Sequence, residues 1–377
     1  MSWLTAEQAL NLLGTKQQTL YANVSRGRIR AKADPADTRR SLYSGDDVNR
    51  LAARQAGRRK NETVAAEAIQ WGDPLLPSAI STVSAGRLFY RGRDAVVLSE
   101  HANLEEVAAL LWDTRRPFQP IAAADGGNAT IEAALMALGR RATRDLPSLG
   151  RSMLALQTES HRVLGTVAGV LAAGRSDLPI HRRLAERWNR PEAASIIRRA
   201  LVLFADHELN ASTFAVRVTA SAGSSLSAAM LSGLATLTGP LHGGAWQAIS
   251  LLVGNAESVG AHEALRHHLA QGRSLPAFGH RLYPEGDPRA AALLDHFDLP
   301  PIFAELQEAA EGMIGERGNV DFALSALAVA FDLPRDAPMI IFALGRTVGW
   351  LAHAMEQAVS GRLIRPRARY IGPTLEA

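Results

Sequence analysis

From about residue 64 to the C-terminus, the sequence is dominated by Ala/Leu-rich segments in which apolar residues recur with a period near 3.6 residues. That period places the apolar side chains of each segment on one face of an α-helix, and such faces must be buried against other helices. The pattern therefore predicts a mainly α-helical fold. The segments that show it are 104–113, 130–143, 160–174, 192–205, 212–236, 245–254, 261–271, 321–331 and 339–360.

A few stretches depart from this helical pattern. The sequence ISTVSAGRLFYRGRDAVVLSE has short alternating runs beside Gly86 and Gly92, which is typical of a small β-hairpin. Glycines and prolines also cluster at 238–244, 272–288 and 372–373, where we expect irregular connections between helices.

The size and composition of the chain limit the kinds of protein it can be. With 377 residues, 47% of them hydrophobic, it can fill the cores of two or three domains. No apolar run reaches the roughly 18 residues of a membrane helix, and the first residues lack the layout of a secretory signal. The absence of cysteine excludes disulfides, thiol nucleophiles and thiolate metal sites. We expect a cytoplasmic protein that makes no contact with a membrane.

Basic charge is concentrated near the N-terminus. Residues 1–60 contain 12 Lys and Arg against 5 Asp and Glu, whereas the rest of the chain contains 29 against 32. Local signals predict a helix that begins at Thr5, a second helix that ends at Gly27, a basic hairpin, and a third helix in SGDDVNRLAARQ. We expect residues 1–57 to form a separate module, joined to the rest by a linker over 58–68.

The N-terminal stretch LTAEQALNLLG…TLY…VSRGRIR, followed by RRSLYSGDDVNRL, resembles the winged helix-turn-helix module of the MerR/excisionase type. The resemblance implies that the second helix enters the major groove of DNA and that the hairpin lies along a phosphate backbone. The solvated face of a docking or dimerisation module would carry the same charge, so both interpretations stay open. The candidate DNA contacts are Lys16, Arg28, Arg30, Arg39 and Arg40.

Three histidines stand at expected helix ends or loops, in unusual contexts. They are His207 in FADHELNAST, His242 in TGPLHGGA and His280 in LPAFGHRLYPEGDPRA. Their spacings of 35 and 38 residues match no metal-ligand pattern, so we expect no metal. Asp321 opens a helix in GNVDFALSALAVAF, and Arg346 lies inside the apolar helix FALGRTVGWLAHAMEQ. Each residue alone has an ordinary structural explanation, but the set favours a functional site.

These motifs, taken in order, resemble the citrate synthase family from about Ile69 to Pro373. The resemblance rests on DHELNAST, GPLHGGA, FGH…DPR, NVD and LGR…IRPR, and GRLFYRGRDAVVLSEHANLEEVAALLW also looks like the N-terminal segment of the family. It implies an almost entirely helical homodimer with a large domain (69–244 and 333–377) and a small domain (245–332). It also implies condensation of acetyl-CoA with oxaloacetate through an enol, then thioester hydrolysis to citrate and CoA. Acetyl-CoA is a co-substrate in this reaction, and no cofactor is implied.

The resemblance further implies roles for individual residues. His242 would bond the thioester carbonyl, Asp321 would take a proton from the acyl carbon, and His280 would polarise the ketone of oxaloacetate. The carboxylates of oxaloacetate would be held by His207, Arg289, Arg346 and, contributed by the partner subunit, Arg365. Candidate supporting residues are Asn210 and Ser212, of which Ser212 would either orient His242 or cap a helix. Candidate CoA contacts are Arg273, Ala277, Gly279 and Arg281.

The chemistry explains why such residues are needed. A thioester α-proton is weakly acidic and a carboxylate is a weak base, so proton removal requires stabilisation of the enol oxygen. An imidazole near a helix N-terminus is biased towards its neutral form and can still donate a hydrogen bond. Gly243 and Gly244 leave room for the acyl-CoA. For Asp321, burial raises the pKa and the helix dipole lowers it, and either influence could be the larger.

Two stretches depart from the family pattern. Pro284 and Glu285 stand where a basic residue for CoA phosphates is usual, and Ala277 replaces the glycine before FGH.

Two alternative functions are a 2-methylcitrate synthase that uses propionyl-CoA, and a DNA-binding regulator whose synthase-like body senses a metabolite without turnover. A third possibility is that the N-terminal module extends the dimer.

Overall fold

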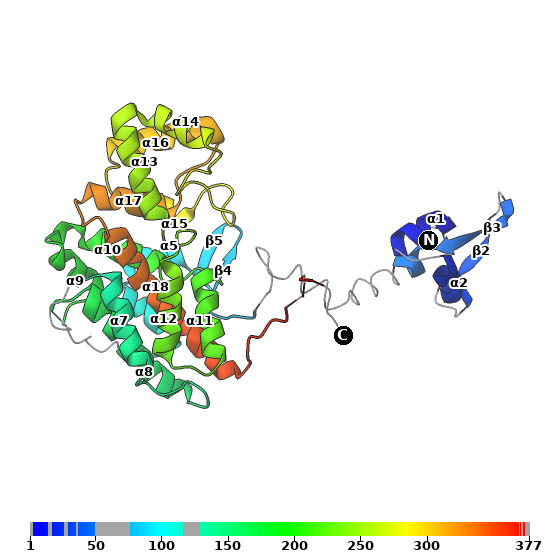
Figure 1. The fold of residues 1–377 in the computed structure, drawn as a ribbon, viewed down its shortest axis with the longest axis horizontal. Helices are drawn as coiled ribbons and strands as arrows, with labels where there is room; N and C mark the ends of the chain where they lie inside the picture. Colours follow the sequence, from blue (N-terminus) through cyan, green and yellow to red (C-terminus); the bar gives the residue numbers. More distant parts are fainter. Residues whose placement is uncertain are drawn as a thin grey trace. The chain divides into compact units, whose positions relative to one another are not determined.

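The computed structural model describes residues 3–13, 17–25, 29–34, 37–49, 76–115, 129–175, 177–368, 370 and 372–373. The chain forms two compact units, one comprising Met1–Pro77 with Pro366–Ala377 and the other comprising Ser78–Arg365. Figure 1 follows the chain through the labelled elements of both units.

The first unit combines two helices with a small antiparallel sheet. Its elements are β1 (Trp3–Leu4), α1 (Ala6–Leu13), α2 (Gln17–Ser25), β2 (Ala31–Asp34) and β3 (Asp37–Ser44), and the strands lie in the order β1-β3-β2. The expected order of two helices and a hairpin is confirmed, and residues 45–49 begin the expected third helix. Assignment to the helix-turn-helix class stays a prediction. The unit has its own small core of Ala9, Leu13, Leu20, Ile29, Tyr43 and Val48.

The second unit begins with a three-stranded antiparallel sheet. Its strands β4 (Ser81–Ser84), β5 (Arg87–Tyr90) and β6 (Arg93–Asp94) pair in sequence order. Gly86 and Gly92 form the two turns with φ angles of 70° and 79°, a left-handed conformation that glycine adopts without strain. The hairpin expected at these glycines is therefore confirmed.

The rest of the second unit is helical, which confirms the mainly helical fold class. Among the described residues, none of the helices is long and apolar enough to cross a membrane. The helices are α5 (Ala95–His101), α6 (Leu104–Leu111), α7 (Ile131–Ala142), α8 (Met153–Leu171), α9 (Ile180–Arg187), the 3-10 helix η1 (Pro191–Ala193), α10 (Ala194–Leu203), α11 (Ala211–Ser221), α12 (Leu226–Leu237), α13 (Ala245–Val259), α14 (Ala261–Ala270), α15 (Pro288–Leu294), α16 (Pro301–Ile314), α17 (Val320–Ala330) and α18 (Ala337–Ser360).

Capping side chains explain where several helices begin. Thr5 and Gln8 exchange hydrogen bonds between their side chains and backbone N–H groups at the start of α1, with distances of 3.3 and 3.0 Å. Asn103 begins α6 with a full capping box, and Asn210 begins α11 by accepting the N–H of Thr213 at 3.0 Å. Each side chain satisfies a backbone donor that the first turn of a helix leaves unpaired.

Two features differ from the expected helices. The segment 212–236, expected as one helix, forms α11 and α12, because the chain turns at Gly223 with a φ of 81° and Ser225 caps the second helix. The helical pattern also does not predict α5, α9, α15 and α16, of which α5, α9 and α15 are eight residues or shorter. Short helices depend on tertiary packing more than on their own periodicity.

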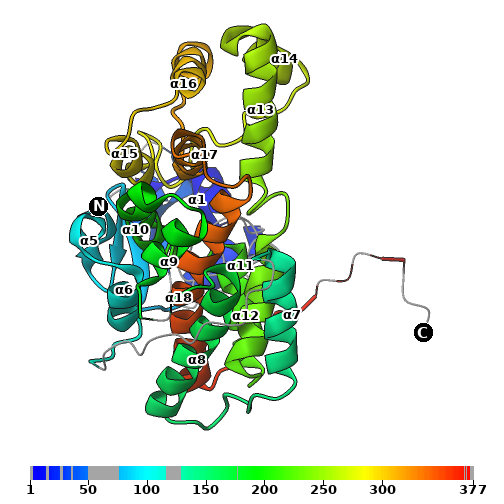
Figure 2. The same cartoon turned by 90° about the vertical axis from the view of Figure 1, so that its left-hand side faces the viewer.

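Two hydrophobic clusters organise the second unit. The larger cluster surrounds α18, which packs against α6, α8, α10, α11 and α12. The smaller cluster joins α13, α14, α16 and α17, and these helices lie in the upper part of Figures 1 and 2. The smaller cluster falls within the predicted small domain, 245–332, whose boundaries stay a prediction.

Two glycines in α18 allow the backbone that follows α10 to approach closely. A side chain at Gly349 would place its Cβ 2.3 Å from both the carbonyl oxygen of Ala205 and Asp206 Oδ1. One turn earlier, a Cβ at Gly345 would lie 2.9 Å from the carbonyl oxygen of Leu201. Gly349 also donates its N–H to Ala205 O at 3.0 Å. This contact holds the segment that carries His207 against the helix that carries Arg346.

The close contact predicts the effect of Gly349→Ala. The added methyl group meets backbone and carboxyl oxygens that cannot move away freely, so we expect a loss of stability of about 1–3 kcal/mol, seen as a lower Tm. Gly254→Ala in α13 is the matched control, because a Cβ there meets nothing within 4 Å and should stabilise the helix by about 0.5–1 kcal/mol. Equal Tm changes in the two variants would show that the approach of the two backbones is not tight at Gly349.

Candidate active site

Arg346 is a buried cation at the centre of the candidate site. Its side chain is 2% exposed, its Nε donates to Phe204 O at 3.0 Å, and its Cζ lies 4.9 Å from the centre of the Phe342 ring. Burial lowers the pKa of Arg346 to about 10, although the charge of Asp206 opposes this shift. Nη1 is buried and has no hydrogen-bond partner among the described residues. A buried guanidinium group with a vacant donor is suited to an anionic ligand.

Asp206 supplies a buried negative charge near this arginine. Its Oδ2 lies 3.1 Å from His353 Nε2 and also accepts a hydrogen bond from Ser81 Oγ. Burial raises the pKa of Asp206, but His353, Arg346 and Ser81 together outweigh burial and hold the pKa below its usual range. The carboxylate form is therefore stable in the interior.

His280 is held by a loop that is joined to the start of α17. Phe278 and Gly318 form an antiparallel bridge, and the Asn319 side chain donates to Gly279 O at 3.0 Å. Leu282 N–H donates to His280 Nδ1 at 3.2 Å. Burial and the charge of Arg289 lower the pKa of His280 to about 4, although Asp287 opposes them. His280 is therefore neutral at pH 7, and its single proton is on Nε2.

Two candidate CoA contacts in this loop have left-handed backbones. Ala277 has a φ of 64° and Gly279 a φ of 66°. The φ of Ala277 gives a physical reason for a glycine before FGH, because alanine is strained in the left-handed conformation. At Gly279 a Cβ would lie 2.6 Å from Glu316 Oε2, the end of an exposed side chain that can move away, so the left-handed backbone is the stronger reason for glycine there. The other two candidates, Arg273 and Arg281, have exposed side chains.

Asp321 lies in the first turn of α17. The cap of this helix is Asn319, whose side chain accepts the Asp321 N–H at 2.9 Å, so the Asp321 carboxyl is not used for capping. The residue keeps a small accessible surface, but protein surrounds its carboxyl group densely. Burial raises the pKa of Asp321 to about 6, although the charges of Arg289 and Arg346 oppose it. Burial therefore outweighs the influences that favour the charged form.

Arg289 forms a buried ion pair with Asp287. Its Nε and Nη2 donate to the two carboxyl oxygens at 2.9 and 2.7 Å, and both side chains are almost completely buried. Asp287 also accepts the N–H of Val320 at 3.2 Å, which ties this pair to the start of α17. Burial lowers the pKa of Arg289, but the charge and hydrogen bonds of Asp287 raise it by more than burial lowers it. Arg289 therefore stays charged.

His207 contacts Tyr283, a residue that the sequence motifs alone do not single out. Its Nε2 lies 2.9 Å from the Tyr283 hydroxyl, and its ring centre lies 5.2 Å from that of His280. Burial and the charges of Arg289 and Arg346 hold the pKa of His207 well below its usual range. The signal for Tyr283 was its position three residues after His280, because a turn brings such residues together.

Ser212 contacts the ring of His242. From the sequence, Ser212 could equally have oriented His242 or capped a helix. His242 Nε2 lies 2.7 Å from Ser212 Oγ, which also donates to Asn210 Oδ1 at 2.8 Å and accepts the Trp350 Nε1–H at 3.2 Å. Burial, with a contribution from Arg346, lowers the pKa of His242 to about 4. His242 is therefore neutral at pH 7, and burial is the main cause rather than the helix dipole that the sequence suggested.

The structure brings most of the predicted site residues together and leaves others apart. His207, His280, Arg289, Arg346 and Asp321 are linked by the contacts and charge effects described above, and His242 is linked through Arg346. Arg365 is exposed near the end of the second unit. Among the candidate DNA contacts, Arg30 pairs with Asp47 at 2.7 Å. Lys16 and Arg28, and the side chains of Arg39 and Arg40, lie outside the described residues.

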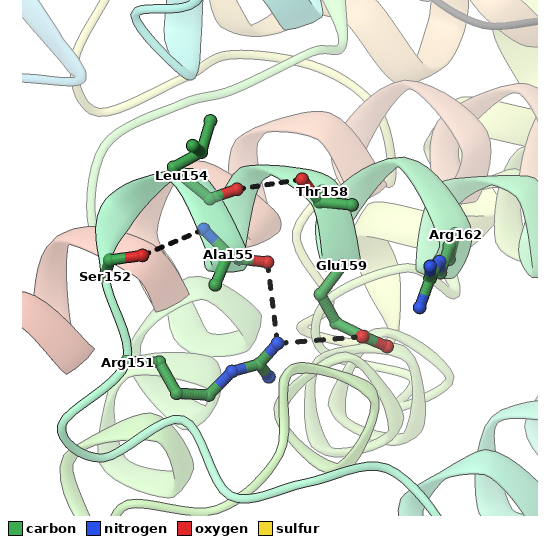
Figure 3. A pocket seen from close by; sticks show the side chains of 7 residues that line it. All are labelled: Arg151, Ser152, Leu154, Ala155, Thr158, Glu159 and Arg162. Atoms are coloured by element: carbon green, nitrogen blue, oxygen red, sulfur yellow. Dashed lines mark hydrogen bonds and ion pairs between the residues drawn. The ribbon is translucent and has the colours of Figure 1, made fainter.

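Two cavities in the second unit are separate from this group. One of about 340 Å³ lies at the start of α8 (Figure 3) and is lined by Arg151, Ser152, Leu154, Ala155, Thr158, Glu159 and Arg162. The other, of about 430 Å³, is lined by Trp246, Gln247, Leu251, Arg335 and Asp336. None of the candidate catalytic residues lines either cavity.

Comparison with known proteins agrees with this arrangement. The family described as citrate synthase, C-terminal domain, matches residues 152–367. Citrate synthase 2 of Bacillus subtilis (strain 168) is 31% identical over 346 residues, which cover 78% of this chain and 93% of that relative. Citrate synthase of Haloferax volcanii is 40% identical over 185 residues, which cover 46% of this chain and 49% of that relative.

Solved structures have the same fold. The crystal structure of citrate synthase from Thermotoga maritima MSB8 has a TM-score of 0.68 at 26% identity and covers 81% of this chain and 96% of that one. A Thermoplasma acidophilum citrate synthase in complex with carboxymethyl coenzyme A and oxaloacetate has a TM-score of 0.66 at 22% identity, covering 81% and 95%, and shows likeness of fold. The chain belongs to the citrate synthase family. It is an enzyme, an acyl-transferring transferase of the citrate synthase type.

The raised pKa of Asp321 predicts that Asp321→Asn stabilises the protein. An acid whose pKa is about 6 in the folded state and 3.8 in the unfolded state is harder to deprotonate when folded. Its charge therefore destabilises the fold above pH 6, by about 3 kcal/mol. We expect the variant to have a higher Tm than the wild type at pH 8, with a gain that shrinks as the pH falls from 6 towards 4.

Asp298→Asn, on an exposed loop, is the control for this experiment and should leave the Tm nearly unchanged. A Tm gain for Asp321→Asn that is the same at pH 8 and pH 4 would show that the charge is not the cause.

Proposed function

We propose that the chain condenses acetyl-CoA with oxaloacetate and hydrolyses the resulting thioester to citrate and CoA. The observation that carries this proposal is the buried group in which His207 and His280 lie side by side, Arg346 Nη1 has no hydrogen-bond partner among the described residues, and burial raises the pKa of Asp321 to about 6. The group combines neutral imidazoles, a carboxyl group with a raised pKa and buried guanidinium groups. A condensation through an enol needs all three kinds of group.

In the proposed reaction, the Asp321 carboxylate takes a proton from the methyl group of acetyl-CoA, while His242 donates a hydrogen bond to the thioester oxygen. The α-carbon of the resulting enolate forms a bond to the ketone carbon of oxaloacetate, and the ketone oxygen takes the proton from His280 Nε2. The proton that Asp321 took from the methyl group then returns to His280 through water, which restores both groups for the next turnover. The hydrogen bond from Leu282 N–H to His280 Nδ1 supports this step, because it leaves the proton on Nε2. Water then hydrolyses the thioester and releases CoA.

The proposed role of His242 requires a particular tautomer. Its Nε2 faces Ser212, so Nδ1 is the nitrogen left to donate to the substrate. Nδ1 carries the proton when the Ser212 hydroxyl donates to Nε2, which turns that hydroxyl away from Asn210 Oδ1. The Ser212 hydroxyl has one proton and two acceptors within reach, Asn210 Oδ1 and His242 Nε2, and the proposed role of His242 requires that this proton goes to Nε2 when substrate is bound.

Arg346 and Arg289 suit the two carboxylates of oxaloacetate. Arg346 Nη1 has no partner among the described residues, and a carboxylate would satisfy it. Arg289 uses Nε and one N–H of Nη2 on Asp287, which leaves the two N–H groups of Nη1 and the second N–H of Nη2 for a ligand. His207 adds a neutral hydrogen bond between these two charges.

We also propose that the enzyme is a homodimer in which Arg365 acts in the site of the partner. Arg346 lies 14 residues before the end of α18, or about 21 Å along the helix, and Arg365 follows that far end. Within one chain, Arg365 therefore lies far from the site that contains Arg346. Apolar side chains that are exposed on α7, α8 and α11, namely Met136, Leu154 and Val218, support burial against a second copy.

The CoA contacts proposed for this chain are Arg273, Ala277, Gly279 and Arg281. Both arginines are exposed, and a guanidinium group can bind phosphate, while Ala277 and Gly279 have left-handed backbones in the loop before His280. Propionyl-CoA differs from acetyl-CoA by one methylene group, which a pocket distinguishes by only about 10–200-fold. Turnover of both substrates, measured side by side, identifies a citrate synthase or a 2-methylcitrate synthase.

The proposed function predicts how Asp321→Ala changes turnover. The wild type should release CoA thiol from acetyl-CoA and oxaloacetate, with kcat/KM falling as the pH drops through about 6, because the base must be deprotonated. Asp321→Ala should retain its fold and lose about 10²- to 10⁴-fold in kcat. Full activity of the folded variant would remove Asp321 from the mechanism.

A regulator that binds DNA through residues 1–57 is the second candidate function. The separate core of the first unit and the excess of basic residues support it. Arg30 remains 55% exposed although it pairs with Asp47, so its charge is partly neutralised at the surface. Lys32 is held against the Trp3 ring, with Nζ 4.3 Å from the ring centre.

This second candidate predicts retention of DNA in a gel shift. The full chain should retard DNA from upstream of its own gene at about 50 mM salt and release it at about 200 mM. The combined variant Arg39→Ala/Arg40→Ala should weaken the shift while thiol release stays at the wild-type rate. Retardation that survives removal of residues 1–57 would exclude this module as the DNA-binding part.

A further inference from the structure

Tyr283 lies among three candidate site residues but has no role in the proposed reaction. Its side chain is 2% exposed, and it belongs to neither hydrophobic cluster of the second unit. Its hydroxyl bonds His207, its ring centre lies 4.9 Å from that of His280, and Arg289 Cζ lies 5.4 Å from the ring centre. A single side chain therefore contacts the three groups that would hold oxaloacetate from this side of the site.

The backbone fixes the position of this ring. Tyr283 N–H donates to His280 O at 2.9 Å, and Gly286 N–H donates to Tyr283 O at 3.0 Å, so two successive turns meet at Tyr283. Gly286 has a φ of 117°, which a residue with a side chain rarely adopts. The first turn places the ring of Tyr283 against the ring of His280, with an angle of 37° between their planes.

The hydrogen bond to His207 has a defined direction. Burial raises the pKa of Tyr283 to about 12, so its hydroxyl keeps its proton. His207 is neutral, because burial and two nearby arginines lower its pKa. A phenol is a strong donor and a neutral imidazole has one lone pair to accept it, so the hydroxyl proton points to Nε2. The proton of His207 is then on Nδ1.

The aromatic ring affects the arginine as well. Asp287 holds two nitrogens of Arg289 from one side, while the face of Tyr283 lies within cation–π distance of the guanidinium group. These two contacts limit the orientations that Arg289 can adopt. The N–H groups of Arg289 that do not bond Asp287 are therefore held in a fixed orientation.

We propose that Tyr283 is a positioning residue for oxaloacetate, whose hydroxyl orients His207 while its ring orients His280 and Arg289. The inference rests on the proposed function and names the substrate that this residue serves. The hydroxyl and ring contacts that carry the proposal involve neither His242 nor Asp321, the groups assigned to the acyl-CoA. Loss of the hydroxyl should therefore affect the keto-diacid and leave the acyl-CoA nearly unaffected.

The test compares Tyr283→Phe with the wild-type enzyme. The variant keeps the ring and removes the hydroxyl, so we expect KM for oxaloacetate to rise on the order of tenfold, while KM for acetyl-CoA stays within about twofold. Tyr283→Leu removes the ring as well and should also lower kcat. Tyr43→Phe is the control, because it removes the hydroxyl of a buried tyrosine in the core of the first unit. It should lower Tm without changing the ratio of the two KM values.

A double-mutant cycle tests whether the hydroxyl acts through His207. The effect of Tyr283→Phe on KM for oxaloacetate should largely disappear in a His207→Asn background. The proposal is overturned if Tyr283→Phe leaves that KM within about twofold, raises both KM values together, or acts equally in the His207→Asn background.

Calorimetric titration with oxaloacetate separates this inference from the proposed function. If the wild type binds oxaloacetate but releases no CoA thiol, the proposed function fails and the role of Tyr283 is read from the Kd, which should rise by the same factor in Tyr283→Phe. A melting curve for each variant shows that it is folded. Should Tyr283→Phe not fold, Tyr283→His supplies the comparison, because it keeps a ring and a donor and should retain most of the oxaloacetate affinity.

Discussion

The site depends on the close contact between α18 and the segment that follows α10. Gly345 and Gly349 allow one backbone to approach the other, and the Gly349 N–H bonds Ala205 O. Arg346 stands between these glycines and donates to Phe204 O, three residues before His207. Tight packing therefore fixes two distant stretches of sequence as one rigid frame, on which the charged groups can be placed accurately.

Within this frame, charged and neutral groups have separate tasks. Asp206 and Asp287 balance the buried charges of Arg346 and Arg289, so that these arginines stay ionised in the interior. The three imidazoles are kept neutral, which makes them hydrogen-bond donors or acceptors and not additional cations. Asp321 has no such partner and retains a raised pKa. A buried carboxyl group with a raised pKa beside buried guanidinium groups is typical of functional sites.

Sequence alone predicted the mainly helical fold and most of the residues of the buried group, because period and motif are local properties. It could not predict contacts that depend on tertiary geometry. Ser212 is equally suited by sequence to a cap and to a partner of His242, and only the position of Asn210 at the start of α11 separates these roles. The motifs did not predict Tyr283, because its contact with His280 depends on the turn that brings the two rings together. The break between α11 and α12 was missed because Ala-rich periodicity continues across Gly223.

The vacant Nη1 of Arg346 has a consequence for the life of the protein in the cell. A buried donor without a partner weakens the folded state, and a bound carboxylate removes that penalty. A ligand that binds the folded chain alone stabilises it by an amount that grows with the logarithm of the ligand concentration. If the proposed oxaloacetate binds at Arg346, copies of the enzyme without it would unfold and meet proteases more often. Metabolite supply would thereby adjust enzyme abundance without any change in gene expression.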